Sequence, residues 1–187
     1  MANNIVSLDD FDILFANFIQ EQLELSDDQV LISYAQRGQK FPEINKDTVF
    51  VKVFQEQDER YTYKQRTRSY NSEIERVISS QAAMRTLLLQ VVFYGYNSDT
   101  LATTLNERFY FDSVKQFLYK NNLALIPDLT DFQDKTFEKI NGQWWERSDL
   151  KLRFYNSVIV EEKTPTIESA DIKYYFDGIK VITDKGE

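Results

Sequence analysis

The sequence has neither cysteine nor histidine among its 187 residues. Without cysteine there is no disulfide scaffold, no thiol catalysis and no thiolate metal site. Without histidine the chain lacks the side chain that most often carries protons near pH 7, which is also the commonest metal ligand. These absences exclude Ser-His-Asp and Cys-His nucleophilic sites and histidine-based zinc sites. We therefore assign no catalytic residue, no metal ligand and no cofactor.

Glycine and proline are also scarce, with 5 and 3 residues. This scarcity favours long regular elements with few tight loops. No stretch reaches 18 consecutive apolar residues, so no transmembrane helix is expected. The N-terminal "MANNIVSLDDFD" has neither the positive region nor the long apolar run of a secretory signal. We expect no membrane partner.

Basic side chains are outnumbered, with 22 Lys and Arg against 30 Asp and Glu, for a net charge of −8 at pH 7. Proteins that bind phosphates tightly show a basic face, and no basic run stands out here. Tight nucleic-acid binding is therefore disfavoured. Hydrophobic residues make up 42% of the chain and aromatic residues 14%, which supports a sizeable core. Length and composition predict a single domain over residues 1–187.

The first half of the chain shows both helical and strand periodicity. Residues 7–24 predict an amphipathic helix that Ser7 caps and whose apolar stripe packs on a core. In the run 48–57, valines at alternate positions form one apolar face, which is typical of a strand. Shorter or more polar runs at 30–35 and 60–70 predict two further strands.

The stretch "ISSQAAMRTLLLQVVFYGYNSDT" at 78–100 contains the most apolar segment of the chain. Its C-terminal part, 87–94, predicts a strand that ends at Gly95, and it is apolar on both faces except for Gln90. A strand of this kind is covered on both faces. Helices are expected on one face, and a second sheet, a helix or another subunit on the other. For the residues before Leu87 two alternatives stay open: a helix to about Arg85, or a strand segment broken near 79–83.

The second half predicts helices over 99–111, with Ser98 or Asp99 as the cap, and over 113–122, ending at two asparagines that tolerate a left-handed backbone. A short strand at 123–127 follows. The pair Asn141-Gly142 predicts a two-residue hairpin turn between two strands, and polar or short strands are expected at 166–176 and near the C-terminus. The order of elements predicts an α+β fold with a mostly antiparallel sheet and helices packed on one face.

Two clusters of carboxylates are candidates for chemistry. Asp128, Asp131 and Asp134 could attract a divalent cation, but the glycine of a calcium loop is missing and a solvated turn explains them better. Glu56, Asp58 and Glu59 could supply an acid–base pair for a glycoside, although nothing in the sequence places them across a cleft and a charged hairpin tip is the simpler interpretation. No glycine-rich phosphate loop is present.

Four side chains are candidates for a subunit or tail interface. Trp144 and Trp145 are adjacent, so in a strand they face opposite sides; one is expected in the core and the other as an exposed anchor for a partner. Arg66 and Arg68 share one face of the run 60–70. They could touch phosphate, or pair across strands with nearby acids, which is the simpler interpretation.

The succession of pieces resembles the phage neck-terminator proteins, a tail-terminator-like family. The matching features are a proline loop at Pro42 before a strand, Gln81 followed by the apolar "VVFYG" of 91–95 and a helix, and the aromatic-x-x-Arg of "WWER" at 144–147 before an alternating apolar strand. The resemblance spans roughly residues 7–160. The segment 164–187 is less clearly matched.

The resemblance implies a structural protein of the virion neck rather than an enzyme. Such subunits form a six-membered ring that caps the tail tube, stops its growth and joins it to the head connector, and they are assembled in the host cytoplasm. The partners implied are further copies of the chain, the tail tube with a sheath protein as a further candidate, and the connector proteins. Arg147 of the "WWER" motif joins the candidate interface residues. Six copies would carry about −48 (6 × −8), so DNA is expected to pass through the channel without specific binding.

Three alternatives stay open beside this interpretation. Another head–tail joining component, such as a stopper or tail-completion protein, fits the same features. A carboxylate-dependent hydrolase would use the acidic clusters, and a nucleic-acid-binding accessory module would show salt-sensitive binding to DNA.

Overall fold

The computed structural model describes residues 7–32, 46–56, 64–71, 76–127, 131–140, 142–165, 172–176 and 179–184. The chain divides into two compact units, Met1–Lys64 with Ala82–Ile159, and Gln65–Gln81 with Val160–Glu187. Two long strands, β4 (Arg76–Tyr94) and β7 (Gln143–Pro165), contribute residues to both units. The expectation of one domain over residues 1–187 stays a prediction.

The main sheet has the strand order β1-β2-β4-β7-β5, and β3 and β6 pair with β4 and β7. Its remaining strands are β1 (Val30–Ile32), β2 (Thr48–Glu56), β3 (Lys64–Asn71), β5 (Leu123–Leu125) and β6 (Asp131–Ile140). A separate ribbon joins β8 (Ile172–Phe176) to β9 (Ile179–Asp184). The pairs β2–β4, β5–β7, β6–β7 and β8–β9 are antiparallel, and β1–β2 is parallel. The predicted α+β class is confirmed.

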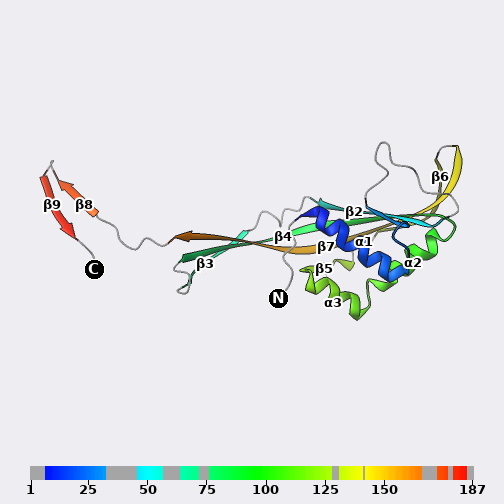
Figure 1. The fold of residues 1–187 in the computed structure, drawn as a ribbon, viewed down its shortest axis with the longest axis horizontal. Helices are drawn as coiled ribbons and strands as arrows, with labels where there is room; N and C mark the ends of the chain where they lie inside the picture. Colours follow the sequence, from blue (N-terminus) through cyan, green and yellow to red (C-terminus); the bar gives the residue numbers. More distant parts are fainter. Residues whose placement is uncertain are drawn as a thin grey trace. The chain divides into compact units, whose positions relative to one another are not determined.

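Three helices lie on one face of this sheet: α1 (Leu8–Leu23), α2 (Ser98–Arg108) and α3 (Asp112–Lys120) (Figure 1). Ser7 caps α1 as predicted, because its side chain accepts a hydrogen bond from the Asp9 amide at 3.2 Å. Neither Ser98 nor Asp99 caps α2; the cap residue is Asn97, so that prediction is wrong. Ser98 is instead fully buried, where its hydroxyl lies 3.5 Å from that of Ser148. None of the helices in the described part of the chain is long and apolar enough to cross a membrane.

The main core lies between the helices and the sheet. It takes every second residue of the three central strands, as the alternation predicts: Val49, Val51 and Val53 of β2, Leu87, Leu89, Val91 and Phe93 of β4, and Leu150, Leu152 and Phe154 of β7. The aromatic stripe of α1 packs on them, with the rings of Phe15 and Phe154 5.2 Å apart. Burial of these rings supplies most of the apolar area that holds the helices on the sheet.

The opposite face of β4 is covered at its C-terminal end by the β6–β7 hairpin of the same sheet. Val92 and Tyr94 are buried there with Phe50 and Trp145. Burial on both faces is therefore confirmed for the C-terminal end of the strand, whereas Leu88 and Gln90 are half-buried; within this chain the cover is a hairpin rather than the expected second sheet or helix, and cover by another subunit stays a prediction.

The residues before Leu87 form neither the predicted helix nor a broken strand. β4 is one continuous strand of 19 residues, and it also pairs with β3. The segment "SQAAMR" has reasonable helix propensity, which pairing with a neighbouring strand overrides.

A buried carboxylate protects the edge of β2 where β1 has ended. Asp12 of α1 is 1% exposed, and its Oδ1 accepts a 2.7 Å hydrogen bond from the amide of Val53. Its other oxygen lies 2.5 Å from the ammonium of Lys52. An unpaired amide at a sheet edge is a template for unwanted pairing, and Asp12 removes it.

The turn after β4 depends on a glycine. Gly95 has φ +122°, and a Cβ added there would lie 2.3 Å from Oδ1 of Asp47 and 2.9 Å from its Cα. The Asp47 carboxylate accepts hydrogen bonds from the backbone amide and the side chain of Asn97, at 3.1 and 2.8 Å. The chain thus leaves the strand and enters α2 through a contact that only glycine permits.

We expect Gly95→Ala to lower the free energy of unfolding by about 2–3 kcal/mol, because it adds a clash with backbone to an unfavourable φ. Gly142→Ala is the matched control. Gly142 also has a positive φ, +84°, but nothing lies within 4 Å of the added Cβ, so about 1 kcal/mol is expected. Urea denaturation measures both. Equal losses for the two variants would show that the approach of Asp47 does not matter.

Candidate assembly surface

The β6–β7 hairpin sits where the sequence predicts a two-residue turn. Ile140 pairs with Gln143, and the register continues through Lys139 with Trp144 and Glu138 with Trp145. Gly142 has the positive φ of such turns, whereas Asn141 lies outside the described residues. The hairpin contacts α2 through β6, at the end of the sheet shown in Figure 1.

The face of the hairpin directed away from the core is aromatic and basic. We call Lys135, Phe137, Lys139, Trp144 and Glu146 the outward hairpin face. Trp144 is 65% exposed and Phe137 62%. The Lys139 ammonium lies 5.9 Å from the centre of the Trp144 ring, which is within cation–π range.

The outward hairpin face extends to Tyr96 in the loop before α2. The ammonium of Lys135 lies 2.7 Å from the Glu146 carboxylate and 5.6 Å from the centre of the Tyr96 ring, which is 82% exposed. The Glu146 carboxylate accepts from Lys135 and raises the pKa of that ammonium. Three exposed aromatic rings and two lysines thus share one contiguous surface.

The inner face of the hairpin anchors it to the core. Trp145 is 5% exposed, and its ring meets that of Tyr94 edge-on at 6.1 Å. The structure therefore divides the tryptophan pair as the strand period of two predicts, with Trp145 inside and Trp144 outside. What Trp144 contacts stays a prediction.

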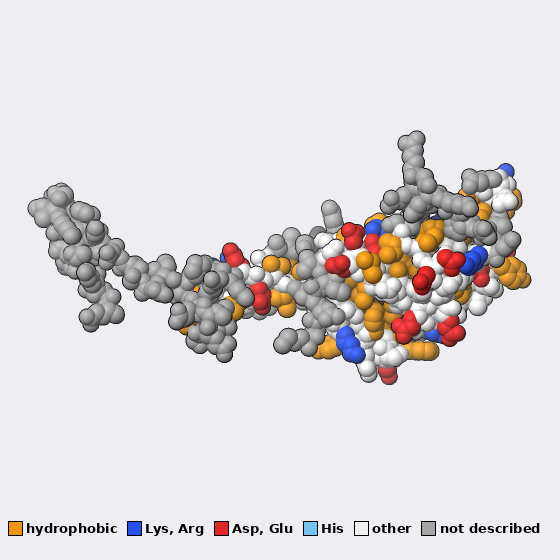
Figure 2. Space-filling model, in the orientation of Figure 1, with side chains coloured by type: hydrophobic (Ala, Val, Ile, Leu, Met, Phe, Trp, Pro, Cys, Tyr) orange, Lys and Arg blue, Asp and Glu red, His pale blue; other side chains and the backbone are white. Residues whose placement is uncertain are grey.

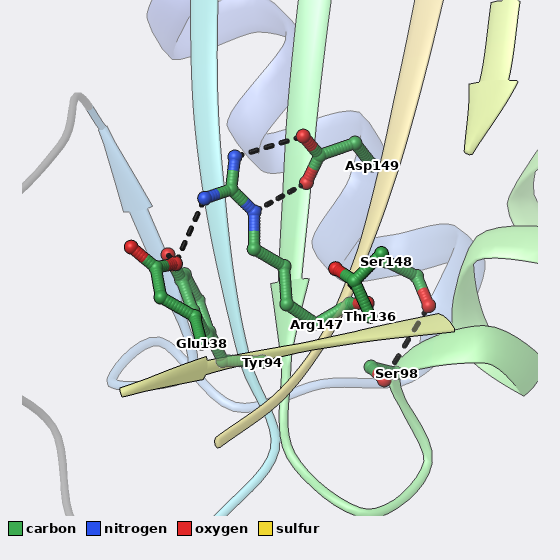
Figure 3. A network of polar contacts seen from close by, with 7 residues as sticks. All are labelled: Tyr94, Ser98, Thr136, Glu138, Arg147, Ser148 and Asp149. Carbon is green, nitrogen blue, oxygen red and sulfur yellow. Dashed lines mark hydrogen bonds and ion pairs between the residues drawn. The ribbon is translucent and has the colours of Figure 1, made fainter. Parts of the chain in front are cut away.

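Arg147 joins the hairpin to its neighbours through the network drawn in Figure 3. Its guanidinium donates two parallel hydrogen bonds to Asp149, at 2.7 and 2.8 Å, and a third to Glu138 at 2.8 Å (Figure 3). Glu138 also accepts a 2.7 Å hydrogen bond from the Tyr94 hydroxyl. The guanidinium lies 5.7 Å from the centre of the Tyr94 ring. All three nitrogens of the Arg147 guanidinium thus donate to carboxylates of its own chain.

The same contacts shift the pKa values of the network. The bonds to Asp149, followed by those to Glu138, raise the pKa of Arg147. Burial, and then donation to Glu138, raises the pKa of the Tyr94 hydroxyl. Glu138 moves the other way, because the hydrogen bonds from Tyr94 and Arg147 stabilise its charged form. At neutral pH the network is fully formed, and it holds the outward hairpin face in one orientation.

The two arginines of β3 lie elsewhere, in the other compact unit. Arg66 and Arg68 are both exposed, and Arg66 donates a 3.1 Å hydrogen bond to the hydroxyl of Ser79 on β4. Among the described residues, Arg66 has the Ser79 hydroxyl as a cross-strand partner, and pairing of either arginine with an acid stays a prediction. A role for either arginine at an interface stays a prediction.

The acidic clusters show no catalytic geometry in the described part of the chain. Both carboxylate oxygens of Glu56 accept a hydrogen bond from Nε of Arg153, at 3.1 and 2.9 Å. Asp58, Glu59 and Asp128 lie outside the described residues, as do the side chains of Asp131 and Asp134. Among the described residues no group of three or more acidic side chains could hold a metal ion.

A shallow groove of about 550 Å³ runs along α2. Acidic, hydroxyl and apolar side chains line it: Asp99, Thr100, Thr103, Thr104, Glu107, Arg108 and Phe111. Phe111, which follows α2, is 58% exposed. We call this feature the α2 groove. Beyond the predicted helix, no pattern in the sequence indicates this groove.

Several residues of the outward hairpin face were not predicted from the sequence, although the position of the turn indicates them. A two-residue turn at 141–142 places 140 opposite 143, and therefore Lys139 opposite Trp144 and Phe137 opposite Glu146. Counting back from the turn would have found them. The positions of Tyr96 and of the α2 groove depend on how separate elements pack against each other. Counting residues back from the turn cannot predict them.

We expect Glu138 to stabilise the fold in a pH-dependent way. Its pKa is lowered from the ordinary 4.5, so its contribution is complete above that pH and is lost as the pH falls through the lower folded value. The free-energy difference between the native chain and Glu138→Gln, measured by urea denaturation, should shrink below pH 4.5. In a Tyr94→Phe background, which lacks the main cause of the shift, the difference should be smaller throughout. A difference independent of pH would contradict the assigned contacts.

Comparison with known proteins supports the resemblance noted above. Residues 9–179 match the family described as phage neck terminator protein. Comparison with the curated proteins finds no match. The match covers the helices, the main sheet and the outward hairpin face, and it reaches into the C-terminal segment that the resemblance covered less clearly. The chain belongs to the phage neck terminator protein family and is a structural protein of the phage head–tail junction.

Proposed function

We propose that this protein forms a ring of six identical subunits at the top of the phage tail, where it ends the tail tube and joins it to the head connector. Family membership supports a neck component, and the outward hairpin face supports assembly. That face is the observation that carries the proposal. Exposed aromatic rings on a rigid support are typical of protein–protein contacts, in which Trp and Tyr are enriched.

The charge of the chain suits a channel that DNA crosses. Acidic side chains are spread over the helical face of the molecule, as Figure 2 shows, and the net charge is −8. A ring of such subunits repels phosphate, so DNA slides through without specific contacts. The proposed partners are further copies of the chain, the tail tube and the connector, with a sheath protein as a further candidate. Assembly takes place in the host cytoplasm.

The rival functions have less support. A hydrolase would need paired, unengaged carboxylates, and Glu56 of the candidate cluster is bound by Arg153. We infer that the protein catalyses no reaction. A stopper or tail-completion protein remains the alternative within the neck, because it would use the same kind of surface.

Electron microscopy of lysates tests the proposal. In a phage whose copy of this gene is interrupted, we expect DNA-filled heads beside detached or overlong tails, because nothing stops the tube or joins it to the connector. A plasmid copy of the intact gene is the control and should restore joined particles. Detached tails of normal length would favour the stopper or completion role. Normal joined particles would overturn the proposal.

A further inference from the structure

The outward hairpin face has a charge opposite to that of the chain as a whole. Its two lysines, Lys135 and Lys139, outnumber its one acid, Glu146, on a chain that carries −8. Lys139 is exposed and sits against Trp144, so the pair presents a flat ring with a positive charge at its side. A partner that fits this surface offers an apolar depression beside a negative charge.

The α2 groove of the same chain has those properties. Its volume of about 550 Å³ falls within the range, roughly 300–1,000 Å³, of sites that take up compact organic groups and is large enough for a side chain from a partner. Three threonines and Phe111 line it together with two exposed acids, Asp99 and Glu107, and Arg108. Asp99 already interacts electrostatically with Lys135 of its own chain, so Glu107 is the acid offered to a partner. Within one subunit Trp144 is not in the groove, because the ring is 65% exposed.

Two different surfaces that complement each other, on one chain, produce a head-to-tail contact that closes into a ring when the rotation permits. We propose that Trp144 of one subunit docks in the α2 groove of the next, with Lys139 facing Glu107. This inference rests on the proposed ring and names its subunit contact. A second copy is the favoured partner, because the complementary surface belongs to the chain itself.

Both surfaces of the proposed contact are held in place within the single subunit, before assembly. Arg147, Glu138 and Tyr94 hold the hairpin from its inner side, so Trp144 loses little freedom on docking. The groove is carried by a helix whose buried face is fixed in the core by Ala102 and Leu105. Preorganised surfaces of this kind bind more tightly than flexible ones of equal area.

A charge exchange tests the contact in the phage itself. Plasmid copies of the gene are supplied to a phage that lacks it, and the titre of infectious particles is measured. Lys139→Glu alone and Glu107→Lys alone each place like charges at every contact, so we expect each to lower the titre by about 100-fold or more. The double variant restores opposite charges and should return the titre to near the native level.

Mixing the two single variants gives the sharpest result. A Lys139→Glu subunit is repelled by its own kind but fits a Glu107→Lys subunit on either side, so the two alternate and close a ring of six. Co-expression should therefore restore infectivity. Rescue by the double variant but not by the mixture would mean that the two side chains act within one chain, and would overturn the proposal.

Matched variants separate this contact from folding and from charge in general. Lys120→Glu on α3 and Glu21→Lys on α1 make the same charge changes at exposed positions outside both surfaces and should leave the titre unchanged. Trp144→Ala should lower the titre while the midpoint of thermal unfolding of the purified chain stays within a few degrees, because the ring is exposed.

The outcomes distinguish the inference from the function on which it rests. Normal titre with either single charge variant, or rings of Trp144→Ala that form but fail to join tails, would overturn the subunit contact and leave the terminator function standing. In the second case the tail tube would be the partner of the outward hairpin face. Normal particles without the gene would overturn both.

Discussion

The structure depends on the need to bury both faces of β4. Residues 87–94 carry apolar side chains on both sides, and no other segment of the described chain has this property over eight residues. One side of the strand holds the three helices, whose buried aromatic rings complete the main core. The other side needs a cover of its own, and the chain provides it by folding the β6–β7 hairpin over Val92 and Tyr94. The cost of exposing such a strand to water makes both covers obligatory.

That constraint also produces the candidate assembly surface. A strand has a side-chain period of two, so a hairpin that inserts Trp145 and Glu138 toward the core must present Trp144 and Lys139 outward. The buried contacts on the inner face of the hairpin therefore determine where the residues of the outward hairpin face lie. The residues of the candidate assembly surface are therefore positioned by core packing, and we expect a change to the network around Arg147 to affect this surface without altering its residues.

The partly buried ion pairs and the exposed charges of the chain have different roles. The pairs that lie partly out of water, Lys52 with Asp12 and Arg147 with Asp149, are short and belong to the fold. Acidic side chains outnumber basic ones in the chain as a whole, whereas the outward hairpin face carries two lysines and one acid. This local excess of positive charge is the basis for proposing a contact with an acidic surface of a second copy of the chain.

The sequence by itself determined the α+β class, the extents of α1 and β2, the strand at 87–94, the turn at 141–142 and the placement of Trp144 and Trp145 on opposite faces, whereas only the structure shows that Trp145 is the buried one. These follow from local rules: caps, turn chemistry and periods of 3.6 or 2 report which face of an element is apolar. The family followed from the order of these pieces. The sequence did not determine that 76–86 continue β4, that Asn97 rather than Ser98 caps α2, or that a hairpin covers the second face. Tertiary structure decided these, because strand pairing and burial act between residues far apart in the chain and outweigh preferences of a few tenths of a kcal/mol per residue.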